Sequence, residues 1–493
     1  MRRRTSTRVV SLVAALAITG ASTVATVAGP AGPAGAATTP GTTPAAAPGR
    51  VTASVTTPAS LAQAALARMT QAQRVGQLFM VGTPATGLST AAASAISTFH
   101  VGNLILTGRS YAGTTPVRYL AATADRRTTS TATAGVPLLV ATDQEGGAVQ
   151  VLQGSGFTRI PTALTQGTWA DTTLTASAAS WGLQLARAGV NLNLAPVMDT
   201  VPATLGTRNP PIGYWYREYG HTPTVVATKG SDVVRGERSA GLAVTAKHFP
   251  GLGHVTANTD TSAGVTDTVT TRTSADIAPF RAAIAAGAPV VMVSLAVYSR
   301  IDASHPAVFS PTVITGMIRG DLGFKGIVVS DDLGNAKQVA AWSPGTRAVA
   351  FIAAGGDVVL TVIASVLPTM VAAVNARATT DPVFRAKVDA AAYRVLLAKA
   401  TYGLLAPRLA TDGVLGPLTV SALQRWLRVT VTGTLGSTTV RALQARVGTT
   451  ADGLWGPASM AALQSYLGIA RDGAGTWNAR TVNAGQAYLN TQL

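Results

Sequence analysis

The sequence predicts an α/β fold: a (β/α)8 barrel followed by a small all-α repeat domain. Eight short apolar segments rich in β-branched residues alternate with longer segments of helical spacing, which is typical of parallel strands buried on both faces. Beyond residue 404, a motif of about 20 residues recurs, as expected of a helical repeat. Hydrophobic residues make up 47% of the chain and charged residues 12%, and cysteine is absent, so a folded chain without disulfides is expected.

The first 36 residues have the pattern of a signal peptide. Four arginines lie among the first eight residues, and an apolar segment at residues 9–20 follows them. This segment is shorter than the roughly 20 residues that span a bilayer. Ala34-Gly35-Ala36 offers a small-residue cleavage site. We therefore expect a signal peptide at residues 1–36, a Thr/Pro/Ala-rich linker at 37–56, and a secreted protein without a stable membrane anchor.

The barrel is expected between residues 57 and 404. A helical pattern at residues 60–73 precedes it, and further helical patterns cover 173–188, 224–240, 274–286 and 311–320. An open doubly wound sheet would need a glycine-rich phosphate turn after an early strand, and the sequence has none. The predicted strands are residues 77–81, 101–106, 136–142, 190–195, 242–246, 289–294, 326–330 and 357–362.

Copies of the C-terminal motif begin at Asp412, Thr432 and Asp452, and a diverged fourth copy begins at Asp472. Each has a glycine turn, a Ser or Thr suited to a helix N-cap, and a short amphipathic helix. The pattern Asp-Gly-x-x-Gly-Pro-x-Thr, followed by Ala-Leu-Gln, resembles the peptidoglycan-binding repeats of bacterial cell-wall enzymes over residues 410–493. The resemblance implies the cell wall as a partner. A helical repeat with an unrelated partner is the alternative.

The aromatic residues of this region can be read in two ways. They could stack on sugar rings, or they could belong to the core of the repeat domain, where aromatics at such spacings more often lie. For Trp426 we favour the core, whereas both readings stand for Trp455, which lies in a turn. The residues concerned are Trp426, Trp455, Tyr466 and Trp477.

Polar residues follow several of the predicted strands. Functional side chains of a (β/α)8 barrel lie just past the carboxyl ends of its strands. Asp143 follows the third strand, Lys247 and His248 follow the fifth, and Asp331 follows the seventh. A carboxylate in such a position can act as a nucleophile, and neighbouring Lys and Arg side chains keep it ionised.

The segment Lys247-His248-Phe-Pro-Gly-Leu-Gly253 closely resembles the signature of glycoside hydrolase family 3, in its bacterial β-N-acetylglucosaminidase branch. The segments at 209–213 and 217–220 resemble a second motif of this family, with two extra residues before Arg217. The resemblance spans about residues 70–404. It implies that Asp331 is the nucleophile, and that Asp143, Arg217, Lys247 and His248 hold the sugar's hydroxyls and acetamido group.

The general acid/base of the family is a histidine, and here Asp260 stands at its position. Asn258 replaces the aspartate that accompanies this histidine in the family. Asp260 could protonate the leaving group if an apolar pocket raised its pKa. His254, six residues earlier in the same loop, is the other candidate.

The leader sequence and the two family resemblances together imply a secreted, wall-associated retaining glycosidase that removes terminal β-N-acetylglucosamine from peptidoglycan fragments. A β-glucosidase of the same family, a non-catalytic wall-sugar-binding protein and a phosphorylase are the alternatives, although a carboxylate at Asp260 would repel phosphate. No cofactor is expected, and the five histidines share no metal-ligand spacing. The net charge of +17 comes without a basic cluster interleaved with aromatics, which argues against nucleic acid as a partner.

Overall fold

The computed structural model describes residues 57–405, 409–427 and 429–492, with side chains up to residue 490. The predicted signal peptide and linker, residues 1–56, lie outside the described residues. Within the part of the chain that is described, no helix combines the length and the hydrophobicity needed to cross a membrane.

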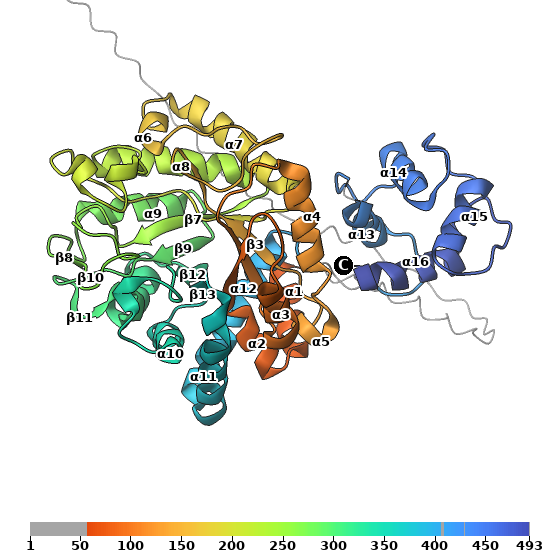
Figure 1. The fold of residues 1–493 in the computed structure, drawn as a ribbon. Coiled ribbons are helices and arrows are strands. Elements are labelled where there is room, and N and C mark those ends of the chain that lie inside the picture. Colours follow the sequence, from red (N-terminus) through yellow and green to blue (C-terminus); the bar gives the residue numbers. More distant parts are fainter. Residues whose placement is uncertain (1–56, 406–408, 428, 493) are drawn as a thin grey trace, which may run out of the picture. The chain divides into compact units, whose positions relative to one another are not determined.

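Eight parallel strands form a single sheet that curls into a nearly closed barrel (Figure 1). The two end strands of the sheet meet through a parallel bridge between Val329 and Val358, where the Ser330 amide donates to the Val358 carbonyl at 2.9 Å. All eight predicted strands lie in this sheet, so the expected barrel is confirmed. In sheet order the strands are β12 (Ile327–Ser330), β9 (Val290–Val293), β7 (Ala243–Phe249), β6 (Leu192–Asn193), β3 (Leu139–Thr142), β2 (Asn103–Thr107), β1 (Phe79–Pro84) and β13 (Val359–Thr361).

Alternate residues of these strands enter two different cores, which explains their continuous apolar sequences. Leu139 and Ala141 of β3 belong to the cluster that fills the barrel, whereas Val140 packs in the outer cluster beneath the helices. In β12, Val329 faces the barrel interior and Val328 faces outward in the same way. Both faces of these two strands are therefore packed in apolar cores.

Helices surround the barrel in sequence alternation with its strands. They are α1 (Pro58–Arg68), α2 (Gln71–Gln77), α3 (Thr90–Phe99), α4 (Thr114–Asp125), α5 (Ser130–Thr133), α6 (Ala163–Gln166), α7 (Asp171–Arg187), α8 (Pro223–Ser239), α9 (Ala278–Ala285), η5 (Thr312–Asp321, with π-type hydrogen bonding), α10 (Pro344–Ala354), α11 (Leu367–Thr380) and α12 (Pro382–Thr401). Short 3₁₀ turns lie between them at η1 (Gly206–Arg208), η2 (Gly213–Trp215), η3 (Ala275–Ile277), η4 (Ala307–Phe309), η6 (Lys337–Val339) and η7 (Ala364–Val366). Small strands outside the barrel pair as β4 (Gln144–Gly146) with β5 (Val149–Gln150), and as β8 (Thr266–Asp267), β10 (Val297–Tyr298) and β11 (Asp302–Pro306).

The helix expected at residues 60–73 is two helices, α1 and α2. Thr70 ends the first segment because its side chain accepts a hydrogen bond from the Gln73 amide, and the Gln73 side chain bonds back to the Thr70 amide. This reciprocal capping box begins a new helix at Gln71. The new helix runs to Gln77, so the first strand begins at Phe79 rather than at Gln77.

Residues 409–492, hereafter the repeat segment, contain four helices. They are α13 (Pro417–Leu427), α14 (Ser437–Val447), α15 (Pro457–Tyr466) and α16 (Ala479–Gln492). One leucine from each helix enters a shared apolar cluster: Leu423, Leu443, Leu463 and Leu489. Trp426, Trp455 and Trp477 are partly buried against this cluster, and the rings of Trp455 and Trp477 stack 4.7 Å apart.

Glutamine side chains join each copy of the motif to the next. Nε2 of Gln444 donates to Asp452 at 2.8 Å, and Nε2 of Gln464 donates to Asp472 at 2.7 Å. The equivalent glutamine of the diverged fourth copy, Gln486, donates to Asp412 of the first copy at 2.8 Å. Together with the bond from Gln424 to Thr432 at 2.9 Å, these links close the four copies into a ring.

Candidate active site

A pocket of about 400 Å³ opens at the carboxyl ends of the barrel strands, where the loops converge. Six of the seven predicted site residues line it, namely Asp143, Arg217, Lys247, His248, Asp260 and Asp331. Residues of the barrel interior form its floor: Ile105, Leu194, Met292 and Leu360. The fold thus brings together side chains that lie up to 188 residues apart in the sequence, from Asp143 to Asp331.

Lys247 is the buried centre of the basic part of the pocket. Its side chain is 2% exposed, and Nζ lies 2.6 Å from an oxygen of Asp143 and 2.6 Å from an oxygen of Glu145. Burial opposes the charge of Lys247, but these two carboxylates outweigh that effect and raise its pKa above the usual value. Lys247 is therefore charged and fixed in one position.

Arg217 and Glu145 form a bidentate ion pair beside Lys247. Nε and Nη2 of Arg217 each donate to a Glu145 oxygen at 2.8 Å, and Nη1 donates to the Pro211 carbonyl at 2.7 Å. Burial alone would raise the pKa of Glu145, but Arg217 and Lys247 lower it to about 2. Glu145 is thus a buried anion that orients both basic side chains toward the pocket.

His248 is held by Asp199, whose side chain is fully buried. Nδ1 of His248 lies 2.8 Å from Oδ2 of Asp199, while Oδ1 accepts the backbone amides of His248 and Leu252 at 3.1 and 2.9 Å. Asp199 accepts the two backbone amides, and with Nδ1 of His248 as the donor it accepts a third hydrogen bond from the imidazole. The second ring nitrogen of His248 remains for the pocket.

Asp331 emerges from the end of β12 into the pocket. Burial and the negative charge of Asp260 raise the pKa of Asp331 to about 6, whereas His248 acts in the opposite direction. The next residue, Asp332, accepts the backbone amides of Gly334 and Val362 at 2.9 and 3.1 Å. Both acids line the pocket, but Oδ1 of Asp332 is engaged by the loop backbone, so Asp332 fixes the loop beside Asp331.

The loop that carries Asp260 is tied to the segment around η6. The Lys337 amide donates to the Asp260 carbonyl, and the Gln338 amide donates to the Thr259 carbonyl, both at 3.0 Å. The side chain of Asn258 accepts the Asp260 amide at 2.8 Å. Asp260 itself is exposed at the pocket rim, close enough to Asp331 for their charges to interact.

His254 is the one predicted site residue that does not line the pocket. Its Nε2 lies 3.3 Å from Oδ2 of Asp276, and the hydrogen bond to this carboxylate raises the pKa of His254. The structure thus brings Asp260, and not His254, to Asp331.

Two residues of the site had no role assigned from the sequence, Glu145 and Asp199. Both stand in strand-end motifs of the sequence, Asp143-Gln-Glu-Gly-Gly147 and Asn193-Leu-Ala-Pro-Val-Met-Asp199. Each lies in a mostly uncharged segment that follows a buried strand, and an acid buried there needs a partner. That signal marks them as members of a buried network but does not identify their partners.

A second buried network supports the loop after β3. Asn193 of β6 accepts the Gln144 amide at 3.1 Å and donates to both carboxyl oxygens of Glu237 at 2.9 and 3.1 Å. Burial raises the pKa of Glu237 to about 8. Gln144 lies between Asp143 and Glu145, so Asn193 and Glu237 hold the backbone that presents these two acids.

Comparisons with known proteins agree with this geometry. The model of the glycosyl hydrolase family 3 N-terminal domain matches residues 70–398. A β-hexosaminidase of Xylella fastidiosa (strain 9a5c) is 33% identical over 347 residues, which cover 67% of this chain and 98% of the relative. A β-hexosaminidase of Stenotrophomonas maltophilia (strain K279a) is 38% identical over 232 residues, or 45% of this chain and 67% of the relative.

Solved structures show the same fold. The crystal structure of a β-N-acetylhexosaminidase from Beutenbergia cavernae DSM 12333 is 52% identical, with a TM-score of 0.67, and the match covers 67% of this chain and 98% of that one. A family 3 β-N-acetylglucosaminidase from Paenibacillus sp. str. FPU-7 is 32% identical with a TM-score of 0.63, over 69% of this chain and 64% of that one. The chain therefore belongs to glycosyl hydrolase family 3 and is a glycoside hydrolase.

Proposed function

We propose that the protein is a secreted retaining glycosidase that removes terminal β-linked N-acetylglucosamine from peptidoglycan fragments. The observation that carries this proposal is the pair of carboxylates, Asp331 and Asp260, which interact within one pocket beside Lys247 and His248. The names of the relatives, β-hexosaminidase and β-N-acetylglucosaminidase, support an N-acetylated sugar as the substrate.

In the first chemical step, Asp331 attacks the anomeric carbon and the bond to the leaving oxygen breaks. Asp260 gives its proton to that oxygen, so the aglycone leaves as a neutral alcohol and a glycosyl ester remains on Asp331. In the second step, Asp260 takes a proton from water, and the water oxygen attacks the anomeric carbon. The ester bond then breaks, and Asp331 is released as a carboxylate. Two inversions give overall retention.

The basic part of the pocket is suited to hold the sugar. Nζ of Lys247 has fixed bonds to Asp143 and Glu145, so its position is set before the substrate arrives. The side chain of Asp143 is 29% exposed and can accept a sugar hydroxyl with its second oxygen. We assign Arg217, Lys247 and Asp143 to the hydroxyls and the acetamido group, and His248 to the neighbourhood of the reacting centre.

The destination of the protein is part of the same proposal. The leader-like sequence of residues 1–36 supports export, and the four-copy repeat segment supports attachment to the cell wall. N-terminal sequencing of the exported chain should find a start near residue 37. A start at residue 1 would contradict the export.

The aryl β-glycosides of N-acetylglucosamine and glucose, assayed side by side, test the activity. We expect turnover of the N-acetylglucosaminide to exceed that of the glucoside at least tenfold, with a free sugar as the product. Equal or greater turnover of the glucoside would identify a β-glucosidase. A sugar phosphate formed in phosphate buffer would identify a phosphorylase, and no turnover of either substrate would leave a binding protein.

A further inference from the structure

The ring of the repeat segment places four equivalent residues against one another. In every copy, the residue two positions after the linking glutamine is large and carries an aromatic ring or a guanidinium group. These residues are Trp426, Arg446, Tyr466 and Tyr488, hereafter the central cluster. They come from four different helices, α13 to α16.

The contacts within the central cluster join neighbouring copies of the ring and, in one case, opposite copies. The Trp426 ring lies 5.8 Å from the ring of Tyr466, which belongs to the opposite copy, and 5.4 Å from that of Tyr488. The two tyrosine rings are 5.6 Å apart, and their hydroxyl oxygens are 3.1 Å apart. The guanidinium of Arg446 lies 4.9 Å from the centre of the Trp426 ring. The four side chains therefore meet at the centre of the ring.

The central cluster combines apolar faces with an accessible positive charge. Arg446 and Tyr466 are exposed, and Trp426 and Tyr488 are half-buried. Among the described residues, no carboxylate forms a salt bridge with Arg446, whereas the acids of the turns, such as Asp452 and Asp472, are engaged by the linking glutamines. The guanidinium is held over an aromatic ring, and its donors can still reach an anion from solvent.

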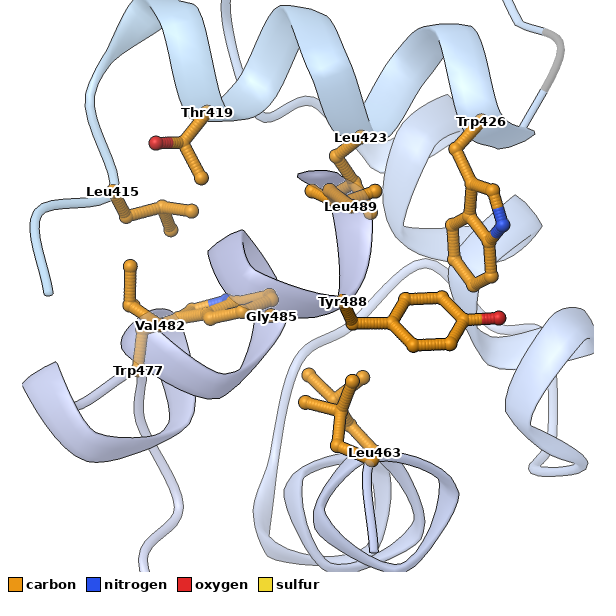
Figure 2. Close-up of a pocket in the computed structure, with 11 residues that line it drawn as sticks. Leu415, Thr419, Leu423, Trp426, Leu463, Trp477, Val482, Gly485, Tyr488 and Leu489 are labelled. Atoms are coloured by element: carbon orange, nitrogen blue, oxygen red, sulfur yellow. The ribbon is translucent and has the colours of Figure 1, made fainter. Parts of the chain in front are cut away.

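A small apolar pocket of about 30 Å³ adjoins the central cluster, since Trp426 and Tyr488 also line this pocket. Figure 2 shows Trp426 and Tyr488 at one end of this pocket and Leu415 and Trp477 at the other. The position before the linking glutamine is a leucine in the first three copies and Gly485 in the fourth, so one leucine side chain is missing from the ring. A Cβ atom at Gly485 would meet nothing within 4 Å.

We propose that the central cluster binds a sugar ring that bears a carboxylate, such as a muramic acid residue whose lactyl group is free. The aromatic rings would cover the apolar face of the sugar, and Arg446 would bind the carboxylate through its planar fork of donors. An uncharged sugar would leave the guanidinium without an anionic partner. This proposal specifies the wall attachment proposed above and is independent of the chemistry in the barrel.

The test is co-sedimentation of the full-length chain with three insoluble or immobilised probes. The probes are intact peptidoglycan, peptidoglycan glycan strands freed of their peptides, and chitin, which has the N-acetylglucosamine ring but no carboxylate. We expect the stripped strands to bind at least as well as intact peptidoglycan and at least tenfold better than chitin. Coupling the carboxylates of the strands to a neutral amine should lower the binding to the level of chitin.

Substitutions locate the site. Arg446→Ala and Tyr466→Ala should each weaken binding to the stripped strands about tenfold, and Arg446→Lys should retain part of it. Arg441→Ala removes the same charge from an exposed position of the same helix and should change nothing. Because Arg446 is exposed, its variants should unfold at the wild-type temperature, whereas Tyr466→Ala also loses ring contacts to Trp426 and Tyr488 and should unfold at a somewhat lower temperature. All variants should hydrolyse a soluble chromogenic substrate at the wild-type rate.

Three outcomes would overturn the proposal. The first is unchanged binding of Arg446→Ala to the stripped strands. The second is equal binding of chitin and stripped strands, or a requirement for the peptides. The third is displacement of the chain from the strands by a single-stranded oligonucleotide at lower concentration than by free glycan. Loss of chromogenic turnover with intact wall binding would instead contradict the glycosidase proposal and leave this one standing.

Discussion

The carboxylate of Asp260 lies close enough to Asp331 to help raise the pKa of Asp331 to about 6. Two acids that repel each other tend to share a single proton, so one is ionised while the other is protonated. A retaining glycosidase needs the opposite division, an ionised nucleophile and a protonated acid, whereas here the raised pKa is that of Asp331 and Asp260 is exposed at the pocket rim. Asp260 is the carboxyl group that stands where the family resemblance led us to expect a histidine, and its role as the acid requires that the bound substrate shield it from water.

Asp260→Asn should separate the two roles of this residue. Turnover of substrates with poor leaving groups should fall by about 10²–10⁴, because no proton is supplied to the departing oxygen. Activated aryl substrates need little protonation and should be affected much less. With these substrates, the acidic limb of the pH–rate profile should move below pH 6, since removal of a neighbouring negative charge lowers the pKa of Asp331.

His254→Asn is the matched control for this prediction. His254 contacts Asp276 and does not line the pocket, so its replacement should leave both classes of substrate unaffected. A large loss with poor leaving groups in His254→Asn, together with wild-type rates in Asp260→Asn, would transfer the acid/base role to His254.

Asp331→Asn should stabilise the fold while abolishing turnover. The folded pKa of Asp331 is raised from 3.8 to about 6, so the folded state favours the neutral acid. The stability that this carboxyl contributes is complete below pH 4 and is lost as the pH rises to 6. The asparagine variant should therefore gain stability relative to wild type across this window, by about 1–3 kcal/mol above pH 6. Thermal unfolding of both proteins at pH 4 and pH 7 measures this gain. An equal difference in stability between variant and wild type at the two pH values would contradict the raised pKa of Asp331.

Glu237→Gln should stabilise the fold over a wider range of pH than Asp331→Asn does. Burial raises the pKa of Glu237 from 4.5 to about 8, so wild-type stability should fall as the pH rises from 4.5 to 8. Glutamine keeps an oxygen acceptor for Asn193 and cannot ionise. The free energy of unfolding of the variant should therefore exceed that of wild type by about 2–4 kcal/mol at pH 8. Denaturant unfolding at pH 5 and pH 8 measures the difference. A variant that is less stable than wild type at both values would show that Glu237 is ionised in the folded protein.

Gly485→Ala should stabilise the repeat segment. Alanine is favoured over glycine within a helix by about 1 kcal/mol, and at position 485 of α16 the added Cβ would meet nothing within 4 Å. Gly182→Ala in α7 is the contrasting control, because its Cβ would lie 3.0 Å from the backbone of Glu237. Calorimetry should show a higher unfolding temperature for the first variant and a lower one for the second. A lower unfolding temperature for Gly485→Ala would mean that the space beside position 485 is too small for a methyl group.

The barrel could be predicted because its strands are dry on both faces and therefore appear as continuous apolar runs between helical patterns. Candidate site residues could be located because chemistry in such barrels gathers at the strand ends. The break at Thr70 was missed because helical spacing continues across it, and only the reciprocal bonds with Gln73 reveal a new helix. The spacing of apolar residues along a segment does not reveal a helix N-cap that lies inside it.

Contacts between residues that lie far apart in the sequence could not be predicted. Arg217 and Glu145 are 72 residues apart, and nothing in the sequence around either one specifies the other. Proximity in the chain also gave no guide to the acid/base, since His254 and Asp260 share a loop whose fold directs them to Asp276 and Asp331 respectively. The ring closure depends on Gln486 reaching Asp412, 74 residues earlier, from the copy whose motif has diverged most.

The most direct test of the account is to identify the residue that carries the covalent intermediate. Wild-type protein would be incubated with a fluorinated N-acetylglucosaminyl donor that forms the glycosyl-enzyme quickly and releases it slowly, then digested and analysed by mass spectrometry. We predict one sugar per chain on the peptide that contains Asp331, with no label in Asp331→Asn. Label on another carboxylate, or an active Asp331→Asn enzyme, would contradict the assignment of Asp331 as the nucleophile.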